Sequence, residues 1–532
     1  MKKFKTAAML MTFVLLTACE PISQNPLGTS AADESESILS TEEITMETEE
    51  TVSFTEYVAE VPEIKNAEAN MIIEAEECGL GGSLYTSDSR KGFSGEGYVT
   101  GFYGGSADQL EISFEIETNQ HYDITICGAA DAEISNHIEV NGKKLQDFSI
   151  NGDGNFTRIT FYGIYMNEGE NIITVKSGNE NFDLDYLEIT NNETIYDTEF
   201  ELPETPANPD TSKEASALLD YMKNQFGKKI ITGQYASNDQ NKELELIYKT
   251  TGKYPAIRFG DIGGYSSSNT PSVSEINAAA DWADRGGIVG FMWYWNSPSE
   301  TKSSVYSKET NFSLKAAMTD QDIAEMDISK INELYSKGLI TVECLNIIKD
   351  IDAVSNSLDT LAQKNIPVLW RPLHEAGGEW FWWGSEGPEA YKWLYNLMYE
   401  RMTEYHKLDN LIWIWNGQSE DYLVDDDRFD IAAIDIYLDP GTEYSSRSEQ
   451  YLWLKKITES GKLLAISECS SLPSIDDMVR DNSLWSFFGL WFGDYITGPA
   501  GNLSEIYTQK EEFIKMYNAE NAVTLDILQR QN

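Results

Sequence analysis

Cationic side chains are scarce in this chain. Its 532 residues include 39 Lys and Arg against 88 Asp and Glu, which gives a formal net charge of −49. Binding to DNA or RNA requires Lys and Arg that cluster on one surface and face the phosphates. The charge balance therefore argues against nucleic acid as a partner, and it favours solubility.

Cysteine and histidine are also rare, with five Cys and four His in the chain. Neither type shows the short spacings of zinc or redox motifs. We therefore expect no metal or other cofactor for catalysis. The sequence leaves open whether Cys78 and Cys127 are bridged.

The N-terminus has the pattern of a secretory signal over residues 1–18. Three Lys precede an apolar stretch from Ala7 to Leu16, which is too short for a membrane-spanning helix. The segment ends in Leu-Thr-Ala followed by Cys19, which resembles the cleavage site of a bacterial lipoprotein. The resemblance implies that Cys19 carries lipid and tethers the protein to the extracellular side of the cell membrane. The alternative is an ordinary signal followed by a chance Cys.

The composition of residues 19–66 predicts a segment that does not fold. They are rich in Ser, Thr and Glu, and no Lys or Arg occurs between Lys5 and Lys65. Such a segment buries too little apolar surface to fold and is extended by its own charge repulsion. We expect a disordered acidic linker that holds the folded domains away from the membrane.

Residues 67–191 contain short alternating runs separated by turn signals such as Asn141-Gly142. This pattern predicts an all-β sandwich. The predicted strands are Met71–Ala75, Leu110–Ile116, Tyr122–Cys127, His137–Val140, Arg158–Tyr162, Asn171–Val175 and Asp185–Ile189. Acidic residues at the strand ends suit Ca²⁺; alternatively, they are edge charges that block aggregation.

The segments 73–76, 94–99 and 184–187 of this region resemble a family 35 (or the related family 6) carbohydrate-binding module with a jelly-roll fold. The resemblance implies a structural calcium near Glu74, Glu76 and Asp185. It also implies a sugar site in the loops at one end, which includes Asn181.

A proline-containing linker, 192–212, leads to a large C-terminal region, 213–532, in which apolar runs alternate with helical stretches. Eight near-continuous apolar strands separated by helices predict a (β/α)₈ TIM barrel of the α/β class. The predicted strands are Lys229–Tyr235, Tyr254–Ile262, Gly287–Trp295, Ile366–His374, Leu411–Gly417, Ile431–Leu438, Leu463–Cys469 and Ser486–Tyr495. The predicted helices are Ser212–Phe226, Val273–Arg285, Ala353–Lys364, Pro388–Tyr405 and Ser448–Glu459, with extra elements expected within 296–365.

The active site of such a barrel lies at the C-terminal ends of its strands. Two glutamates stand there, Glu375 after the fourth strand and Glu468 at the end of the seventh. Glycoside hydrolysis needs two carboxyl groups, one protonated and one ionised. The other strand ends supply aromatic and amide side chains, which we expect to contact the sugar: Trp295, Asn416, Tyr437 and Trp491.

Local sequence suggests how the two roles divide. Trp380 and the aromatic residues after it shield Glu375 from water, which raises the pKa of a carboxyl group and suits an acid. Tyr437 stands one strand from Glu468 and can donate a hydrogen bond that keeps this carboxylate ionised. We expect Arg371 to form a buried ion pair inside the barrel.

The segment 370–384, Trp-Arg-Pro-Leu-His-Glu-Ala-Gly-Gly-Glu-Trp-Phe-Trp-Trp-Gly, resembles the acid/base segment of glycoside hydrolase family 26. Similar support comes from 254–256, 287–296, 411–416 and 435–437. The resemblance implies a retaining endo-β-1,4-mannanase with Glu375 as acid/base and Glu468 as nucleophile. His374, Trp380 and Tyr437 would line the subsite of the attacked sugar, and Trp491 would form its floor.

Two positions depart from the family pattern. Tyr294 stands where His is expected in Trp-His-Trp-Asn, and Gln234-Tyr235 follows the first strand where Gly-His-Gln-Asp is common. These departures leave linkage specificity open, so the alternative substrates are mixed-linkage β-glucan and β-1,3-xylan. A second alternative is an inactive lipoprotein that only captures glycan. We expect β-mannan or a related polysaccharide as the partner, and a monomer.

Overall fold

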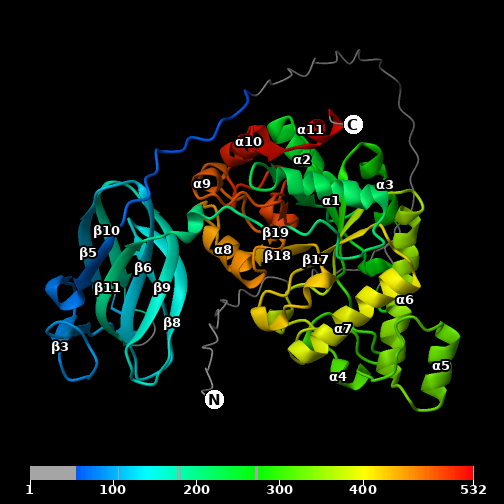
Figure 1. Ribbon diagram of the computed structural model, residues 1–532, viewed down its shortest axis with the longest axis horizontal. Coiled ribbons are helices and arrows are strands. Elements are labelled where there is room, and N and C mark those ends of the chain that lie inside the picture. The colour runs from blue at the N-terminus through cyan, green and yellow to red at the C-terminus, as the bar shows by residue number, and fades with distance from the viewer. Residues whose placement is uncertain (1–54, 106, 177, 179–180, 270–273, 531–532) are drawn as a thin grey trace, which may run out of the picture.

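The computed structural model describes residues 55–105, 107–176, 178, 181–269 and 274–530, which fold into two domains (Figure 1). Each domain has its own apolar core, one within residues 75–189 and a larger one within 215–528. The expected signal, Cys19 and most of the expected linker lie outside the described residues. Within the described ranges, no helix is long and apolar enough to span a bilayer.

The first domain is a β-sandwich, as the alternating runs predict. One sheet has the order β3-β4-β11-β6-β9, with β1 paired to β11, and the other has the order β2-β5-β10-β7-β8. Asn141 and Gly142 form the predicted turn between β7 and β8, with φ of 52° and 79°. The strands are β1 (Asn70–Glu74), β2 (Gly79–Leu80), β3 (Tyr85–Ser87), β4 (Tyr98–Thr100), β5 (Gln109–Ile116), β6 (Gln120–Ala129), β7 (Ile134–Val140), β8 (Lys143–Ile150), β9 (Thr157–Met166), β10 (Gly169–Lys176) and β11 (Asp183–Asn191).

Four strands of the sandwich lie outside the predicted runs. β2, β3 and β4 span only two or three residues, and β8 lacks strict alternation of apolar and polar residues. Such strands form because a neighbouring strand supplies hydrogen-bond partners, which is a tertiary effect. Cys78 and Cys127, whose pairing the sequence leaves open, are both free thiols.

Eight parallel strands close the predicted barrel in the second domain, in sequential order from β13 to β20. Its first predicted strand, 229–235, is split. Ile230–Ile231 (β12) pair with Ala522–Val523 (β21) in a separate two-stranded sheet, and only β13 enters the barrel. The barrel strands are β13 (Gly233–Tyr235), β14 (Ile257–Asp261), β15 (Ile288–Met292), β16 (Val368–Arg371), β17 (Leu411–Trp415), β18 (Ile431–Ile436), β19 (Leu463–Cys469) and β20 (Phe488–Leu490).

Helices surround the barrel (Figure 1). The predicted helix 353–364 is the C-terminal half of a longer helix, α6, and the region before it carries α4 and α5. Four helices outside that region, α2, α9, α10 and α11, were not predicted from the sequence. The helices are α1 (Lys213–Gln225), α2 (Lys242–Thr251), α3 (Glu275–Asp284), α4 (Leu314–Ala317), α5 (Ile328–Ser336), α6 (Val342–Ala362), α7 (Pro388–Glu400), α8 (Ser448–Ile457), α9 (Ile475–Arg480), α10 (Lys510–Asn518) and α11 (Leu525–Gln529).

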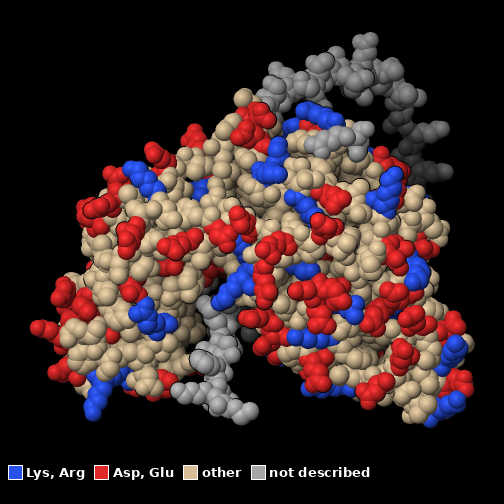
Figure 2. Space-filling view, in the orientation of Figure 1, with Lys and Arg blue, Asp and Glu red and all other residues tan. Residues whose placement is uncertain are grey.

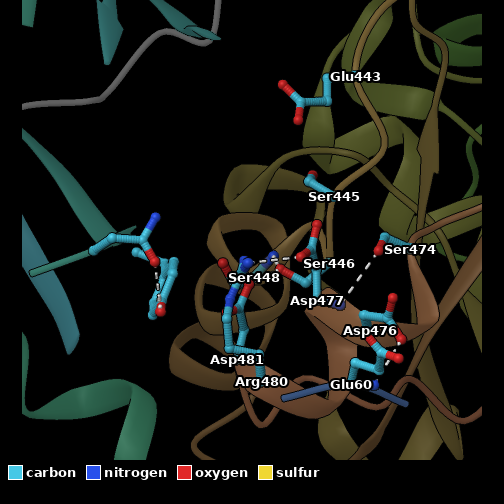
Figure 3. Close-up of polar contacts among 12 residues, drawn as sticks. Glu60, Glu443, Ser445, Ser446, Ser448, Ser474, Asp476, Asp477, Arg480 and Asp481 are labelled. Atoms are coloured by element: carbon cyan, nitrogen blue, oxygen red, sulfur yellow. Dashed lines mark hydrogen bonds and ion pairs between the residues drawn. The ribbon is translucent and has the colours of Figure 1, made fainter. Parts of the chain in front are cut away.

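The domains meet along a buried polar junction. His121 of β6 is fully buried, and its Nε2 lies 2.7 Å from Oδ1 of Asp481. Asp481 also accepts a hydrogen bond from Arg480 at 2.6 Å and one from Ser446. Figure 3 shows Ser446, Arg480 and Asp481 grouped on the barrel side of this junction. The His121–Asp481 bond fixes the orientation of the module, because separating the domains would break it and leave two buried polar groups without each other.

The C-terminal part of the expected disordered linker, from residue 55, lies within the described residues and contacts the barrel. Tyr57 docks on the barrel: its hydroxyl donates to Asp476 at 2.8 Å, and its backbone N–H donates to the Asn518 carbonyl at 2.8 Å. The ammonium of Lys515 lies 5.1 Å from the centre of the Tyr57 ring. This aromatic anchor holds the segment around Tyr57 against the barrel, which the acidic composition alone does not reveal.

Acidic side chains cover both domains on the face shown in Figure 2, with Lys and Arg interspersed among them. The chain as a whole has a net charge of −49. This face therefore lacks the continuous basic surface that polyanion binding needs.

Candidate active site

The fourth barrel strand delivers Glu375 to the barrel mouth through two unusual backbone turns. β16 ends at Arg371, and both Leu373 and Glu375 then adopt a left-handed φ of 53°. The Glu375 N–H donates to the Asn416 carbonyl at 2.8 Å, which ties this turn to the end of β17. Non-glycine residues in this conformation carry strain, which is typical of functional sites.

Glu375 lies against the indole of Trp380. Trp380 Nε1 donates to Glu375 Oε2 at 3.1 Å. Gly378 makes this approach feasible, because a Cβ there would lie 1.9 Å from the Trp380 ring. Burial, together with the charges of Asp435 and Glu468, raises the pKa of Glu375 well above its usual range, despite the lowering by Arg371 and Trp380. This carboxyl group is therefore suited to hold a proton near neutral pH.

Glu468, near the end of β19, is 4% exposed and hydrogen-bonded by two donors. Tyr437 donates its hydroxyl to Oε2 at 2.6 Å, and Arg371 Nη2 donates to Oε1. Burial and the charge of Asp435 raise the pKa of Glu468 to about 7, despite the lowering by Arg371 and the Tyr437 hydroxyl. Glu468 therefore ionises at a lower pH than Glu375. Burial and two like charges raise the pKa of Glu375, and among the described residues no cation is bonded directly to it.

Arg371 organises the floor between these acids, as the predicted buried ion pair. Its Nη1 donates to Asp435 Oδ2 at 2.9 Å and to Asn416 Oδ1 at 2.7 Å. Ser467 donates to the other Asp435 oxygen at 2.5 Å. The guanidinium thus joins β16, β17, β18 and β19 and holds Glu468 in one rotamer. This role of Asp435 was not predicted from the sequence.

Two predicted substrate contacts are corrected by the structure. Trp295 is fully buried: its indole N–H donates to Asp350 at 2.7 Å, and its ring stacks on Trp293 at 4.0 Å. Asn416 is also fully buried, and its amide N–H donates to the Ala433 carbonyl at 3.1 Å. Both residues therefore lie beneath the surface of the site. Residues next to a strand end are covered wherever the adjoining loop folds back over them.

The other predicted lining residues lie at the mouth. Tyr437 is 38% exposed, and Trp491 is half-buried with its ring against Tyr235 at 4.7 Å. His374 is 2% exposed and packs against Phe381. Burial and then the charge of Arg371 lower the pKa of His374 well below its usual range, so its imidazole is neutral.

The acids predicted to bind calcium gather around one turn of the module. Ser94 donates its hydroxyl to Glu74 at 2.7 Å and its backbone N–H to Asp185 at 2.9 Å. Glu76 Oε1 accepts backbone N–H groups at 2.8 and 3.0 Å, while its buried Oε2 has no partner. Among the described residues, no group of three or more Asp, Glu, His or Cys side chains is placed to hold a metal ion.

Asn181, the predicted sugar ligand of the module, has its side chain engaged within the protein. Its Oδ1 accepts the Gly101 N–H at 3.0 Å, and its Nδ2 donates to Thr100 at 3.2 Å. Among the described residues of the module, three aromatic side chains are exposed: Tyr85 at 50%, Tyr103 at 64% and Tyr162 at 48%. Tyr85 and Tyr103 were not predicted as sugar contacts, because neither stands in a patterned motif.

Comparison with known families decides the identity of this site. Residues 207–515 match the model of glycosyl hydrolase family 26, and residues 71–192 match carbohydrate binding module family 35. The chain belongs to glycosyl hydrolase family 26. It is therefore a glycoside hydrolase with an N-terminal binding module, and the two expected family resemblances are confirmed.

Similar proteins extend across both domains. The chain is 30% identical to a mannan endo-1,4-beta-mannosidase of Thermothelomyces thermophilus, over 86% of this chain and 90% of that protein. It is 32% identical to mannan endo-1,4-beta-mannosidase B of a Piromyces species, over 82% and 75%. The solved structure of a GH26-CBM35 β-(1,4)-mannanase of Podospora anserina aligns over 86% of this chain and 98% of that chain, with 29% identity and a TM-score of 0.57. The predicted TIM barrel with a β-sandwich module is thus confirmed.

Proposed function

We propose that this family 26 enzyme is a retaining endo-β-1,4-mannanase that hydrolyses mannan, glucomannan and galactomannan. The observation that carries the proposal is one barrel mouth with two carboxyl groups in different electrostatic states, Glu375 and Glu468. Relatives named as mannan endo-1,4-beta-mannosidases, which match both domains, support the substrate.

The proposed mechanism is a double displacement. The Glu468 carboxylate attacks the anomeric carbon as Glu375 donates its proton to the departing glycosidic oxygen, which forms a glycosyl-enzyme ester. The Glu375 carboxylate then takes a proton from water. The water oxygen displaces Glu468 and leaves a sugar with its original β configuration.

The chain provides the setting for both steps. Trp380 donates a hydrogen bond to Glu375 at 3.1 Å and lines the subsite of the attacked sugar together with the neutral His374. Trp491 provides an aromatic surface for the same sugar. Tyr437 donates to Glu468 in the free enzyme and releases this oxygen as the ester forms.

A substrate panel tests the proposal. Reducing ends released from glucomannan, galactomannan, lichenan and β-1,3-xylan are measured, and the anomer formed first is followed by NMR. Fastest release from the mannans with a β product is expected. Preference for lichenan or xylan would assign one of the alternative substrates, and binding without release from any of them would support the inactive glycan-binding protein instead.

The pH profile should move when Tyr437 loses its hydroxyl. The Tyr437 hydrogen bond lowers the pKa of Glu468, so Tyr437→Phe raises this pKa. The acid limb of kcat/KM follows ionisation of Glu468 and should move upward by roughly one pH unit, the size of one net hydrogen bond. Tyr444→Phe, on the same loop, should leave the limb in place. A downward shift, or none, in the Tyr437 variant would contradict the nucleophile assignment.

We also propose that the module holds glycan and binds calcium. Exposed Tyr85 and Tyr103 support a sugar surface near Asn181. Tyr103→Ala should therefore weaken retardation of the protein in mannan-containing gels, and an unchanged mobility would refute this surface.

The unpartnered Glu76 Oε2 supports the calcium proposal. Glu74, Glu76 and Asp185 would bind the ion, and backbone carbonyls would complete its coordination.

Calcium should stabilise the folded protein, because a ligand of the native state raises the free energy of unfolding. At 100 times the dissociation constant, the stabilisation is about 2.7 kcal/mol. Thermal melts with Ca²⁺ and with EDTA measure this difference. Glu76→Gln should remove it, and Glu60→Gln, an exposed acid, should not. Equal melting temperatures of the wild type in Ca²⁺ and EDTA would exclude the site.

The cell-surface location and monomeric state are proposals that rest on the sequence. Cys19→Ala should release the protein from the membrane fraction if Cys19 carries lipid, and continued membrane association would contradict the anchor.

Light scattering at micromolar concentration should give the mass of one chain. The mass of a dimer would refute the proposed monomeric state.

A further inference from the structure

Two connections at the barrel mouth are joined by main-chain hydrogen bonds. One is the segment Val305–Ser307, between β15 and α6, and the other is Trp380–Trp382, between β16 and α7. Ser307 N–H donates to the Trp380 carbonyl at 2.7 Å, and Trp382 N–H donates to the Val305 carbonyl at 3.0 Å. Tyr306 pairs with Phe381 in an isolated antiparallel bridge between these bonds. The backbone that carries Trp380 is therefore held by the connection after β15.

The side chain of Tyr306 fastens this ladder to the barrel. Its hydroxyl and the hydroxyl of Tyr294 lie 2.9 Å apart in a hydrogen bond. Its ring stacks on Phe381, with ring centres 5.8 Å apart and an angle of 28° between the planes. Both tyrosines are half-buried. Loss of either hydroxyl would remove this link and leave the rings in place.

Tyr294 is itself fixed to the ends of two barrel strands. It stands two residues beyond the end of β15, and its backbone N–H donates to Asp261 of β14 at 2.8 Å. The amide of Asn269 donates to its carbonyl at 2.6 Å. Its ring centre lies 5.8 Å from that of Phe381, at an angle of 82°. Tyr294 is thus the rigid end of the hydroxyl link, and Tyr306 is the end on the longer connection.

The other end of this chain of contacts is the carboxyl group of Glu375. Trp380 receives the Ser307 bond on its carbonyl and donates its indole N–H to Glu375 Oε2 at 3.1 Å. A displacement of Tyr306 would pass through the ladder to this indole. Catalytic proton transfer is sensitive to such displacements, because donor and acceptor must lie within hydrogen-bond distance.

We propose that Tyr294 and Tyr306 act as one hydroxyl-linked unit that positions Trp380, and through it the acid/base Glu375, for proton donation to the leaving group. Neither tyrosine is a catalytic residue, since each acts through Trp380. The inference rests on the proposed acid role of Glu375. It gives a function to Tyr294, one of the two positions where this chain departs from the family pattern.

The test compares two substrates in a double-mutant cycle. Tyr294→Phe, Tyr306→Phe and the double variant are assayed on mannan, whose leaving group needs a proton, and on 2,4-dinitrophenyl β-mannobioside, whose leaving group does not. On mannan, kcat should fall about 10-fold with little change in KM, the scale of one positioning hydrogen bond. On the aryl substrate, the change in the first step should stay within about 2-fold.

The double variant should be no worse than either single variant, because both remove the same bond. Tyr335→Phe, an exposed tyrosine of α5 in the same connection, serves as the matched control and should match the wild type on both substrates. The ratio of the two activities is taken within each variant, so partial unfolding cancels. Additive losses, equal losses on both substrates, or wild-type activity on mannan would each overturn the proposal.

Glu375→Ala, assayed on the same pair of substrates, separates this inference from the proposed function. If that variant loses both activities equally, the acid role fails. If it shows the contrast between substrates and the tyrosine variants do not, the positioning role of the tyrosine pair fails and the acid role stands.

Discussion

Glu468→Ala abolishes hydrolysis of mannan, with an expected fall in kcat of at least about 10⁴-fold, because Glu468 is the group that forms the glycosyl-enzyme ester. The fold should survive, since Arg371 keeps its bonds to Asp435 and Asn416. Reducing-sugar release measures the loss, and circular dichroism checks the fold. Residual activity above about 1% of the wild type would refute the nucleophile assignment.

Azide sharpens this test. A small anion can occupy the space of the missing Glu468 carboxylate and attack the anomeric carbon from the same side. With an activated aryl mannoside, Glu468→Ala should therefore yield the α-mannosyl azide. Glu420→Ala, which removes an exposed acid of the same domain, should behave as the wild type and give no α-azide. Recovery of a β-azide from the Glu468 variant would place this residue in another role.

Glu375→Ala should separate substrates by their leaving groups. Loss of a general acid costs about 10²- to 10⁴-fold when the leaving group needs a proton, so hydrolysis of mannan falls by that amount. Formation of the glycosyl-enzyme from a 2,4-dinitrophenyl mannoside needs no acid, and its rate should change by less than about 10-fold. Pre-steady-state release of dinitrophenol measures this step directly.

Glu379→Gln supplies the matched control for Glu375. Glu379 is an exposed acid of the same loop, and its substitution should leave both substrates unaffected. In Glu375→Ala, azide should attack the glycosyl-enzyme from the β face and give the β-mannosyl azide, opposite to the product of Glu468→Ala. Equal losses on mannan and on the aryl substrate would show that Glu375 is not the acid.

The sequence alone was sufficient to place both candidate acids. Each stands at the end of a buried apolar run, and parallel strands of a barrel bring their C-terminal ends together, so Glu375 and Glu468 had to share one mouth. The Tyr437 hydrogen bond to Glu468 and the buried ion pair of Arg371 followed from the same geometry, and both are present.

Residues close to a strand end were harder to assign. Trp295 and Asn416 have the right residue types and positions, yet both are fully covered. Burial there depends on whether a connecting loop folds back over the strand end, and that path is set by contacts with other connections. Periodicity along one segment carries no information about such contacts.

The sequence by itself therefore determined the two-domain architecture, the barrel and the pair of acids, because those follow from local periodicity and from the closure of parallel strands. Only the tertiary structure decided how the acids are held. The bond between Tyr294 and Tyr306 and the junction of His121 with Asp481 join residues 12 and 360 positions apart. Such pairings arise from packing between loops and between domains, and each is stabilised by partners that no local pattern specifies.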